Sequence, residues 1–179
     1  MKRLSTKEIL AESFKELARD RSIEKITIRQ IAENCDYSPA TFYRQFKDKY
    51  DLIAWDYARE IESTINMIGT DGFTWQDALR ETARCHEEHR DYLANLFLHT
   101  SGMYSFEQYM AEVSFRLIKR LIREKTPELS LVEERCIWVY CYGEVRNIMD
   151  WILGRYDADA QTMAQIYEKA VPEVLNRYL

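Results

Sequence analysis

The sequence predicts an all-α protein of about nine helices. Only 5 Gly and 3 Pro occur among its 179 residues, too few for a turn-dense all-β fold, whose hairpins and tight corners consume those residues. Helix start signals recur along the whole chain, and no segment alternates apolar and polar residues as a half-buried strand does. The apolar content of 46% is ordinary for a globular chain and excludes a disordered one.

The starts of several predicted helices are marked by capping boxes. In this pattern a Ser or Thr oxygen accepts from the third helical N–H, and a Glu or Gln three residues later reaches back. The pattern occurs at Ser5…Glu8, Thr27…Gln30, Ser105…Gln108 and Ser130…Glu133. Together with the apolar spacing, these signals predict helices over residues 5–20, 28–34, 39–46, 48–68, 74–88, 89–99, 105–125, 130–154 and 158–178.

Charge is distributed unevenly between the two ends of the chain. Residues 1–55 hold 11 Lys and Arg against 9 Asp and Glu, whereas residues 56–179 hold 14 against 21, for a net charge of −5. A mildly basic N-terminal part on an acidic remainder indicates that the N-terminal end is the part that meets a polyanion.

Several protein classes are excluded by sequence features that are missing. The glycines do not fit G-x-G-x-x-G and no Gly-Lys pair exists, which excludes the common nucleotide-binding loops. The longest uncharged stretch, residues 92–106, is too short to span a bilayer, and charges interrupt any apolar signal core at the N-terminus. The four cysteines show no C-x-x-C spacing, so we expect free thiols in a cytoplasmic protein.

Residues 27–46 read TIRQIAENCDYSPATFYRQF, two short predicted helices joined by a tight turn at residues 35–37. The second of these helices opens with the small residues Pro39, Ala40 and Thr41. This is the pattern of a helix-turn-helix, whose second helix enters a DNA major groove about 12 Å wide with small or hydrogen-bonding residues at its leading end. The alternative is a three-helix packing unit that binds no DNA.

In this part the sequence resembles the TetR family of bacterial one-component transcription regulators. The resemblance is carried by residues 27–32, 38–46 and 47–52, where an aromatic-Tyr-x-x-Phe run is followed by Lys-x-x-Leu. It implies a helix-turn-helix DNA-binding unit at residues 1–50 and a helical effector-binding and dimerisation unit at residues 51–179. The last two long helices would pair with those of a second copy into a four-helix bundle.

The resemblance also implies which residues meet DNA. Thr27, Tyr43 and Lys49 match positions that usually touch phosphates, and others match positions that face the groove or its edge. The full predicted set is Thr27, Arg29, Ser38, Pro39, Ala40, Thr41, Tyr43, Arg44 and Lys49. Because residues 39–41 include no Arg, Asn or Gln, the strongest bidentate base contacts are expected from Arg29, Arg44 or Gln45.

The C-terminal part carries most of the aromatic residues, and the candidate effector pocket is sought there. Its candidate residues are Trp75, His86, Tyr92, Phe97, His99, Tyr104, Tyr109, Trp138, Tyr142 and Arg146. The alternative for each is that it fills the core or the dimer interface. For Arg146, the alternative is a pair with Asp150 four residues later.

Neither a metal site, a cofactor nor catalysis is expected. Residues 86–89 read H-x-x-H and not the H-E-x-x-H of zinc hydrolases, so they are interpreted as a solvated helix end. All three histidines lie between residues 86 and 99, and no G-x-S-x-G occurs. The features that an active site requires are therefore missing from the sequence.

These features favour a homodimeric, sequence-specific DNA-binding regulator with a palindromic operator as its partner. A repressor released by a small-molecule effector is the leading hypothesis. The alternative is a regulator of the same fold that is controlled by a protein partner, because the C-terminal half resembles the regulators of dihydroxyacetone kinase operons within the family. No residue sets the sign of regulation, the operator sequence or the identity of the effector.

Overall fold

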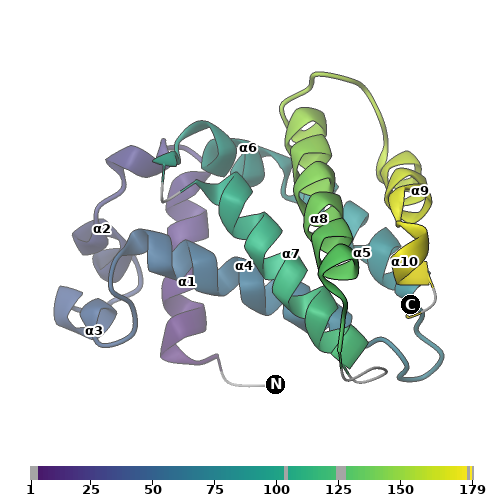
Figure 1. Cartoon of the computed structure of the whole chain (residues 1–179). Coiled ribbons are helices and arrows are strands. Elements are labelled where there is room, and N and C mark those ends of the chain that lie inside the picture. The colour runs from purple at the N-terminus through teal and green to yellow at the C-terminus, as the bar shows by residue number, and fades with distance from the viewer. Residues whose placement is uncertain (1–3, 103–104, 124–127, 177, 179) are drawn as a thin grey trace.

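The computed structural model describes residues 4–102, 105–123, 128–176 and 178. These residues form ten α-helices and one short 3-10 helix, with no strand (Figure 1). The helices are Thr6–Ala18 (α1), Ile28–Asn34 (α2), Pro39–Tyr43 (α3), Lys49–Ile65 (α4), Trp75–Glu88 (α5), Arg90–Leu98 (α6), Phe106–Arg123 (α7), Leu131–Ile152 (α8), Ala160–Ala170 (α9) and Glu173–Asn176 (α10), and the 3-10 helix is Ile23–Lys25 (η1). The predicted all-α class is confirmed.

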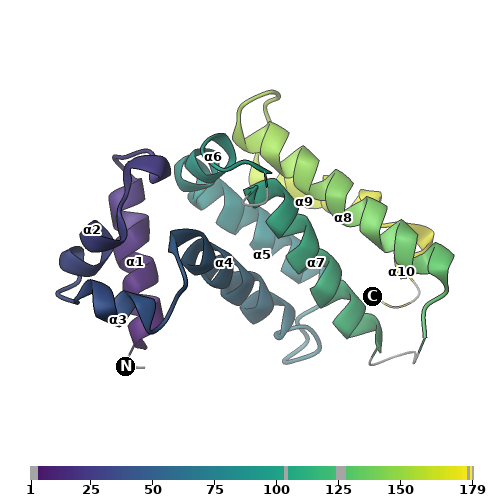
Figure 2. The ribbon, with the colours of Figure 1, turned by 60° about the vertical axis from the view of Figure 1, so that its left-hand side comes forward.

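The first three helices form a small unit, which we call the headpiece. Its core holds Leu10, Phe14, Ile31 and Phe42, each fully buried. These side chains come from α1, α2 and α3, so the apolar faces of three short helices are buried together. Figure 2 shows α1–α3 grouped on one side of the molecule, with α4 between them and the remaining helices.

Helices α4–α10 form the larger part, which we call the body. Within it α5 packs against α9, and α7 packs against α8. Helix α4 contacts α1 on one side and α5 and α7 on the other, so it joins the two parts. Trp151 and Tyr167 are the largest fully buried side chains of the body.

Two predicted helices are shorter in the structure. The helix expected over residues 158–178 is broken into α9 and α10, because Pro172 lacks the backbone N–H and its ring clashes with the preceding turn. The helix expected over 39–46 ends at Tyr43 in the structure. The other boundaries agree with the prediction to within a few residues, as is usual for helix ends.

Candidate functional site

Local hydrogen bonds fix the two helices of the helix-turn-helix. Thr27 caps α2, where its Oγ1 accepts from the Gln30 N–H at 3.2 Å and Gln30 Oε1 accepts from the Thr27 N–H at 2.9 Å. Ser38 caps α3 and accepts from the Thr41 N–H at 3.2 Å. Between the helices Asp36 adopts φ 58°, a left-handed conformation that short polar side chains tolerate. The orientation of α3 is therefore encoded by its own neighbours in the sequence.

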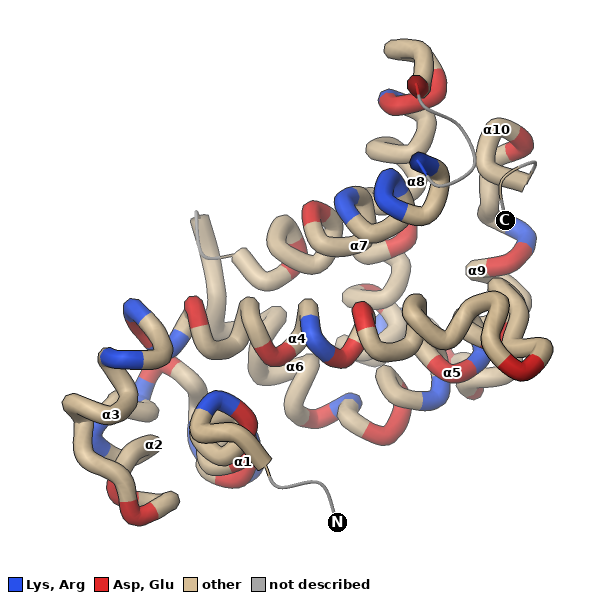
Figure 3. The backbone as a smooth tube through the Cα atoms, turned by 90° about the horizontal axis from the view of Figure 1, so that it is seen from below, with Lys and Arg blue, Asp and Glu red and all other residues tan. Residues whose placement is uncertain are grey.

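Most of the predicted DNA-binding residues are exposed and lie on or next to α2 and α3. Thr27, Arg29, Ser38, Pro39, Ala40, Tyr43 and Arg44 are exposed, whereas Thr41 and Lys49 are half-buried. Figure 3 shows Lys and Arg positions next to α3.

The aromatic pair in α3 separates a core side from a surface side. Phe42 is fully buried, while the adjacent Tyr43 is 60% exposed. Their rings stand edge to face with centroids 5.9 Å apart. Arg44 Nη2 donates to Thr41 Oγ1 at 3.1 Å, and Arg29 Nε donates to Glu33 Oε1 at 2.7 Å. Both arginines are exposed and are held by a neighbour on their own helical segment.

Lys49 has a different environment from the other predicted DNA-binding residues. Its ammonium donates to the backbone carbonyls of Ile23, Glu24 and Ile26 at 2.7, 3.1 and 3.0 Å. Three such bonds use all three of its donors, and burial lowers the pKa of this lysine. The phosphate contact implied for Lys49 stays a prediction. Its observed contacts tie the start of α4 to the end of η1.

Lys47 is a cation that the sequence reasoning missed. Its side chain is exposed, and its backbone N–H donates to Asp51 Oδ2 at 2.9 Å. It lies directly before the Asp48 cap of α4, close in sequence to α3. The only signal for it was its position within the Lys-x-Lys segment, where Lys49 was preferred.

A network of charged side chains joins the headpiece to the body. Lys15 of α1 pairs with Asp56 of α4 at 2.8 Å and also with Glu60. Arg59 Nη2 binds the other oxygen of Asp56 at 2.9 Å, and its Nη1 lies 3.3 Å from Glu8 of α1. Asp56 is buried, with only 2% of its surface exposed.

Asn95 of α6 makes a second connection to the headpiece. Its Nδ2 donates to the carbonyls of Ala18 and Arg21, both at 2.8 Å. Its Oδ1 accepts from the Ile23 N–H at 3.2 Å. One amide therefore satisfies three backbone groups just after α1, in the segment that leads to α2. Neither connection could be found from sequence spacing, because the partners lie 41 to 77 residues apart.

The ten predicted effector-pocket residues do not share one cavity. Trp75 and His86 line a cavity of about 50 Å³ in the body. His86 also lines a second cavity of about 20 Å³, together with Tyr92. Tyr109 lines a separate, larger groove, and Tyr104 lies outside the described residues.

The other predicted pocket residues make different contacts. Phe97 packs on Phe106, with ring centroids 5.3 Å apart. Trp138 packs on Phe115 at 5.0 Å and on Tyr142 at 4.6 Å.

Two charged or titratable members of the predicted set lie toward solvent. Arg146 is exposed and lies 3.5 Å from Glu107 and 3.4 Å from Asp150. His99 is half-buried and lies 4.0 Å from Glu24. Neither of them lines the two interior cavities.

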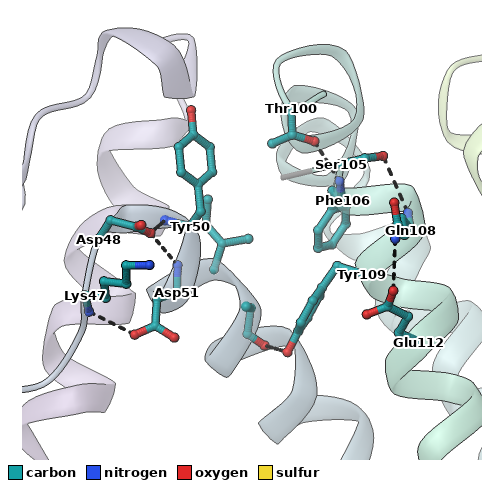
Figure 4. A pocket seen from close by; sticks show the side chains of 12 residues that line it. Lys47, Asp48, Tyr50, Asp51, Thr100, Ser105, Phe106, Gln108, Tyr109 and Glu112 are labelled. Carbon is teal, nitrogen blue, oxygen red and sulfur yellow. Dashed lines mark hydrogen bonds between the residues drawn. The ribbon is translucent and has the colours of Figure 1, made fainter. Parts of the chain in front are cut away.

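The groove at Tyr109 has about 470 Å³ and lies between the first turn of α4 and the N-terminal half of α7 (Figure 4). Several of its polar side chains are bonded to nearby protein groups. Asp48 Oδ1 accepts from two backbone N–H groups of α4 at 2.9 Å, and Glu112 accepts from Gln108 at 3.0 Å. The Tyr109 hydroxyl donates to the Ala54 carbonyl at 2.6 Å. These bonds explain the local geometry of the groove.

Two titratable groups that line one cavity of the body have displaced pKa values. Burial lowers the pKa of His86 to about 4, with a smaller effect from His89, so its imidazole is neutral at pH 7. Burial raises the pKa of Glu144 to about 7. Both side chains line the cavity of about 50 Å³.

An apolar face runs along the outer side of α8. Leu131, Val132 and Val139 are 71%, 72% and 69% exposed. Together with Cys136 and Pro172 they line an open groove of about 600 Å³. Large aliphatic side chains gathered at this exposure are typical of a surface that another chain covers.

Each of the two parts of the chain matches a known protein-family model. Residues 9–54 match the family model described as "Bacterial regulatory proteins, tetR family". Residues 74–172 match the model described as "Transcriptional regulator C-terminal region". The described residues contain no helix that is long and apolar enough to cross a membrane.

One curated relative is the HTH-type dhaKLM operon transcriptional activator DhaS of Lactococcus lactis subsp. lactis (strain IL1403). It is 25% identical over 97 residues, which are 54% of this chain and 51% of that protein. The match thus spans about half of the length of that relative.

Similar solved structures cover nearly the whole chain. The dihydroxyacetone kinase operon activator DhaS has a TM-score of 0.66 and 18% identity, with 97% of this chain and 96% of that chain covered. A TetR regulator from Rhodococcus sp. RHA1 has a TM-score of 0.64 and 11% identity, with 98% and 99% covered. Thermus thermophilus FadR, a TetR family repressor in complex with lauroyl-CoA, has a TM-score of 0.61 and 18% identity, with 97% and 95% covered. These likenesses show the shared fold, and the family models show that the chain belongs to the TetR family of bacterial transcription regulators.

Proposed function

We propose that the protein is a homodimeric, sequence-specific DNA-binding repressor that a small-molecule effector releases from its operator. The observation that carries the proposal is the exposed surface around α3, where Tyr43 and Arg44 lie outside the buried Phe42. In this proposal residues 1–50 read DNA and residues 51–179 bind the effector and dimerise. Helix α4 starts at Lys49 and connects the two functions.

The chemistry of the α3 surface supports direct reading of the major groove. Pro39 and Ala40 at its leading end are small, exposed and suited to contact with a thymine methyl group. Arg44, held at 3.1 Å by Thr41, is placed to reach a guanine edge or a phosphate. Tyr43 is a phosphate ligand through its hydroxyl, and such contacts fix the register on DNA.

We assign the phosphate contact near the start of α4 to Lys47. Lys47 is exposed, whereas the three donors of Lys49 are bonded to backbone carbonyls. Moving Lys49 to a phosphate would break all three bonds, which costs free energy. Lys47 can bind a phosphate without that loss.

Dimerisation is proposed through the apolar face of α8. Leu131, Val132 and Val139 expose most of their surface to solvent. Burial of such side chains in an interface removes apolar surface from water and so favours a dimer. A twofold dimer also presents two α3 surfaces to two half-sites of a palindromic operator.

Control by an effector requires that it binds the two conformations of the body with different affinity. Allosteric coupling of this kind is typically about 1–3 kcal/mol. The body offers two interior cavities beside His86 for such a ligand. Helix α4 lines both of them and also contacts α1, so a change there can reach the headpiece. The similar FadR is a repressor and DhaS is an activator, so activation is the alternative sign.

A second candidate is control by a protein partner. The small volumes of the interior cavities, about 20 and 50 Å³, favour it, because a large effector does not fit without rearrangement of the body. The two candidates differ in what dissociates the operator complex. A small molecule alone suffices in the first, and a second protein is required in the other.

The test is operator binding by the full chain. A labelled duplex from the upstream intergenic region is titrated at several salt concentrations, beside a scrambled duplex of the same length. We expect the Arg44→Ala substitution to weaken binding to the operator by about 1–3 kcal/mol. The control, Arg80→Ala, removes an exposed arginine of α5 in the body and should leave the affinity unchanged.

Equal affinity for both duplexes, or equal effects of the two substitutions, would contradict the proposal. Equal affinity points to binding of DNA through charge alone. Equal effects of the substitutions mean that the α3 surface has no special role.

A further inference from the structure

Gly143 is a glycine that the contacts within one copy of the protein do not explain. The other four glycines, at positions 69, 72, 102 and 154, have φ angles between 60° and 83°, a conformation that L side chains rarely adopt. Gly143 lies inside α8 and is exposed, and no described residue comes within 4 Å of the position that a Cβ atom would occupy. Glycine destabilises a helix interior relative to alanine, so the missing side chain points to a contact with another chain.

Gly143 belongs to an uncharged row of residues along the outer side of α8. Val132, Cys136 and Val139 precede it at the spacing i, i+4 and i+7, which places residues on one face of a helix, and Gly143 continues the row at i+11. All four residues are exposed, and Val132 and Val139 leave 72% and 69% of their surface uncovered. We call these four residues the α8 stripe.

The α8 stripe is complementary to a second copy of itself. Its spacing of four, three and four residues reads the same in both directions along the helix. In a twofold contact residue i meets residue j while j meets i, so two antiparallel stripes cover each other completely in one register. Val132 of each copy then faces Gly143 of the other, and Cys136 faces Val139. The branched valine occupies the space that the missing glycine side chain leaves.

The residues at both ends of the stripe favour this register over its neighbours. A shift of one helical turn toward the C-terminus would bring Arg146 against Val132. Arg146 is exposed and pairs with Glu107 and Asp150, and burial of a charged group against an aliphatic side chain is unfavourable. A shift in the other direction would place Gly143 beyond the residues at which the second α8 begins, so this helix would not cover it.

We propose that α8 pairs antiparallel with α8 of a second copy, with Val132 of each copy packed on Gly143 of the other. This inference rests on the proposed homodimer and names the contact that sets its geometry. The distance between packed helices depends on the side chains at their contact, and glycine permits a close approach. The register also fixes where the two headpieces lie, and thereby the half-site spacing that two α3 surfaces can read.

The first experiment is a disulfide cross-link between full chains that carry Cys136→Ser, which removes the exposed native thiol. Val132→Cys and Gly143→Cys are made separately in this background, mixed, allowed to exchange subunits and oxidised with copper phenanthroline. A disulfide requires Cα atoms about 4.4–6.8 Å apart. In the proposed register equivalent residues of the two copies lie about 16 Å apart along the helices. We therefore expect a covalent dimer in the mixture and none from either variant alone.

The second experiment measures the dimer dissociation constant by analytical ultracentrifugation. Gly143→Leu fills the space for Val132 and should raise this constant by at least about tenfold, because overpacking an interface destabilises it. The protomer should still fold, since no described residue lies within 4 Å of the added Cβ, and circular dichroism checks this. Adding Val132→Ala to Gly143→Leu makes room and should recover part of the affinity. The matched control is Gln76→Leu at an exposed position of α5, which should dimerise like wild type.

Three results would overturn the pairing: a covalent dimer from Gly143→Cys alone, no covalent dimer in the mixture, or equal dissociation constants for Gly143→Leu and wild type. The Cys136→Ser chain alone controls for cross-links through the remaining cysteines. If wild type is a dimer while one of these results is found, only the pairing is refuted and the proposed homodimer stands. A wild type that sediments as a monomer at every concentration would contradict both.

Discussion

The Lys15 ammonium of α1 lies 2.8 Å from the Asp56 carboxylate of α4, and Asp56 is only 2% exposed. Arg59 binds the second oxygen of Asp56 at 2.9 Å, so each oxygen has a cationic partner. Burial lowers the pKa of Lys15, but Asp56 and Glu60 outweigh it and raise this pKa overall. An interior ion pair therefore holds the headpiece on the body at the point where α1 crosses α4.

Removal of Asp56 should strongly destabilise the fold. Asp56→Ala leaves Lys15 partly buried without this carboxylate, and breaking a buried pair from one side costs about 3–5 kcal/mol. The change is measured as the loss in free energy of unfolding in urea. The matched control is Glu62→Ala on the same helix, which breaks an ion pair with Arg120 in which both side chains are more than 40% exposed; we expect at most about 1 kcal/mol there. Similar losses for the two variants would show that the buried Asp56 pair contributes no more to the free energy of unfolding than the exposed pair does.

Lys47 and Lys49 should differ in a salt titration of operator binding. If Lys47 contacts a phosphate, Lys47→Met lowers the slope of log affinity against log salt by about 1, with stability changed by less than about 0.5 kcal/mol. Lys49→Met removes three bonds to carbonyls, so it should lower the free energy of unfolding by about 1–3 kcal/mol and leave the slope unchanged. The reverse pattern would show that Lys49, and not Lys47, contacts the phosphate.

The parts of the fold that the sequence predicted depend on short-range contacts. The capping boxes at Ser5, Thr27 and Ser130 are formed as expected, because both partners lie within one helical turn. The same holds for the turn at Asp36 and the N-cap at Ser38. These local signals were enough to define the helix-turn-helix and most helix starts.

The proposed effector site could not be predicted in the same way, because the cavities of the body depend on contacts between distant helices. His86 and His89 stand three residues apart, yet one is buried in the body and the other is exposed. Trp138 was an equally reasonable pocket residue by type, but it packs on Phe115 of α7. Lys49 shows the same limit, since its carbonyl partners lie 23 to 26 residues earlier in the chain.

The free energy of unfolding should depend on pH in a way that is caused by His86. Its pKa is lowered from 6.5 to about 4 in the folded state, so between these values the unfolded chain binds a proton that the folded chain does not. The contribution is absent above about pH 6.5, and it destabilises the fold progressively as the pH falls to 4, by roughly 3 kcal/mol in total. Urea unfolding of wild type and His86→Leu at several pH values gives this contribution as their difference. A constant difference from pH 7.5 to 4 would contradict the buried neutral imidazole.

Glu144 lines the same cavity, and its contribution to the pH dependence of the free energy of unfolding should have the opposite sign. Its pKa is raised from 4.5 to about 7, so between these values the folded chain binds the additional proton. The fold gains stability from this group as the pH falls from 7 to 4.5, and that gain opposes the loss from His86. Glu144→Gln should therefore steepen the loss of stability on acidification relative to wild type. A shallower loss in this variant would exclude the raised pKa.

The apolar face of α8 should control the oligomeric state. Val139 is 69% exposed on this face, and Val139→Asp would place an unpaired charge in a buried interface, which is strongly unfavourable. We expect analytical ultracentrifugation to give a dimer for wild type and a monomer for this variant. Leu98→Asp is the matched control, because Leu98 is 63% exposed on α6, away from that face, and it should remain a dimer. If Val139→Asp also sediments as a dimer while its thermal unfolding is unchanged, the two copies must meet through another surface, and the spacing of the two α3 surfaces must be derived anew.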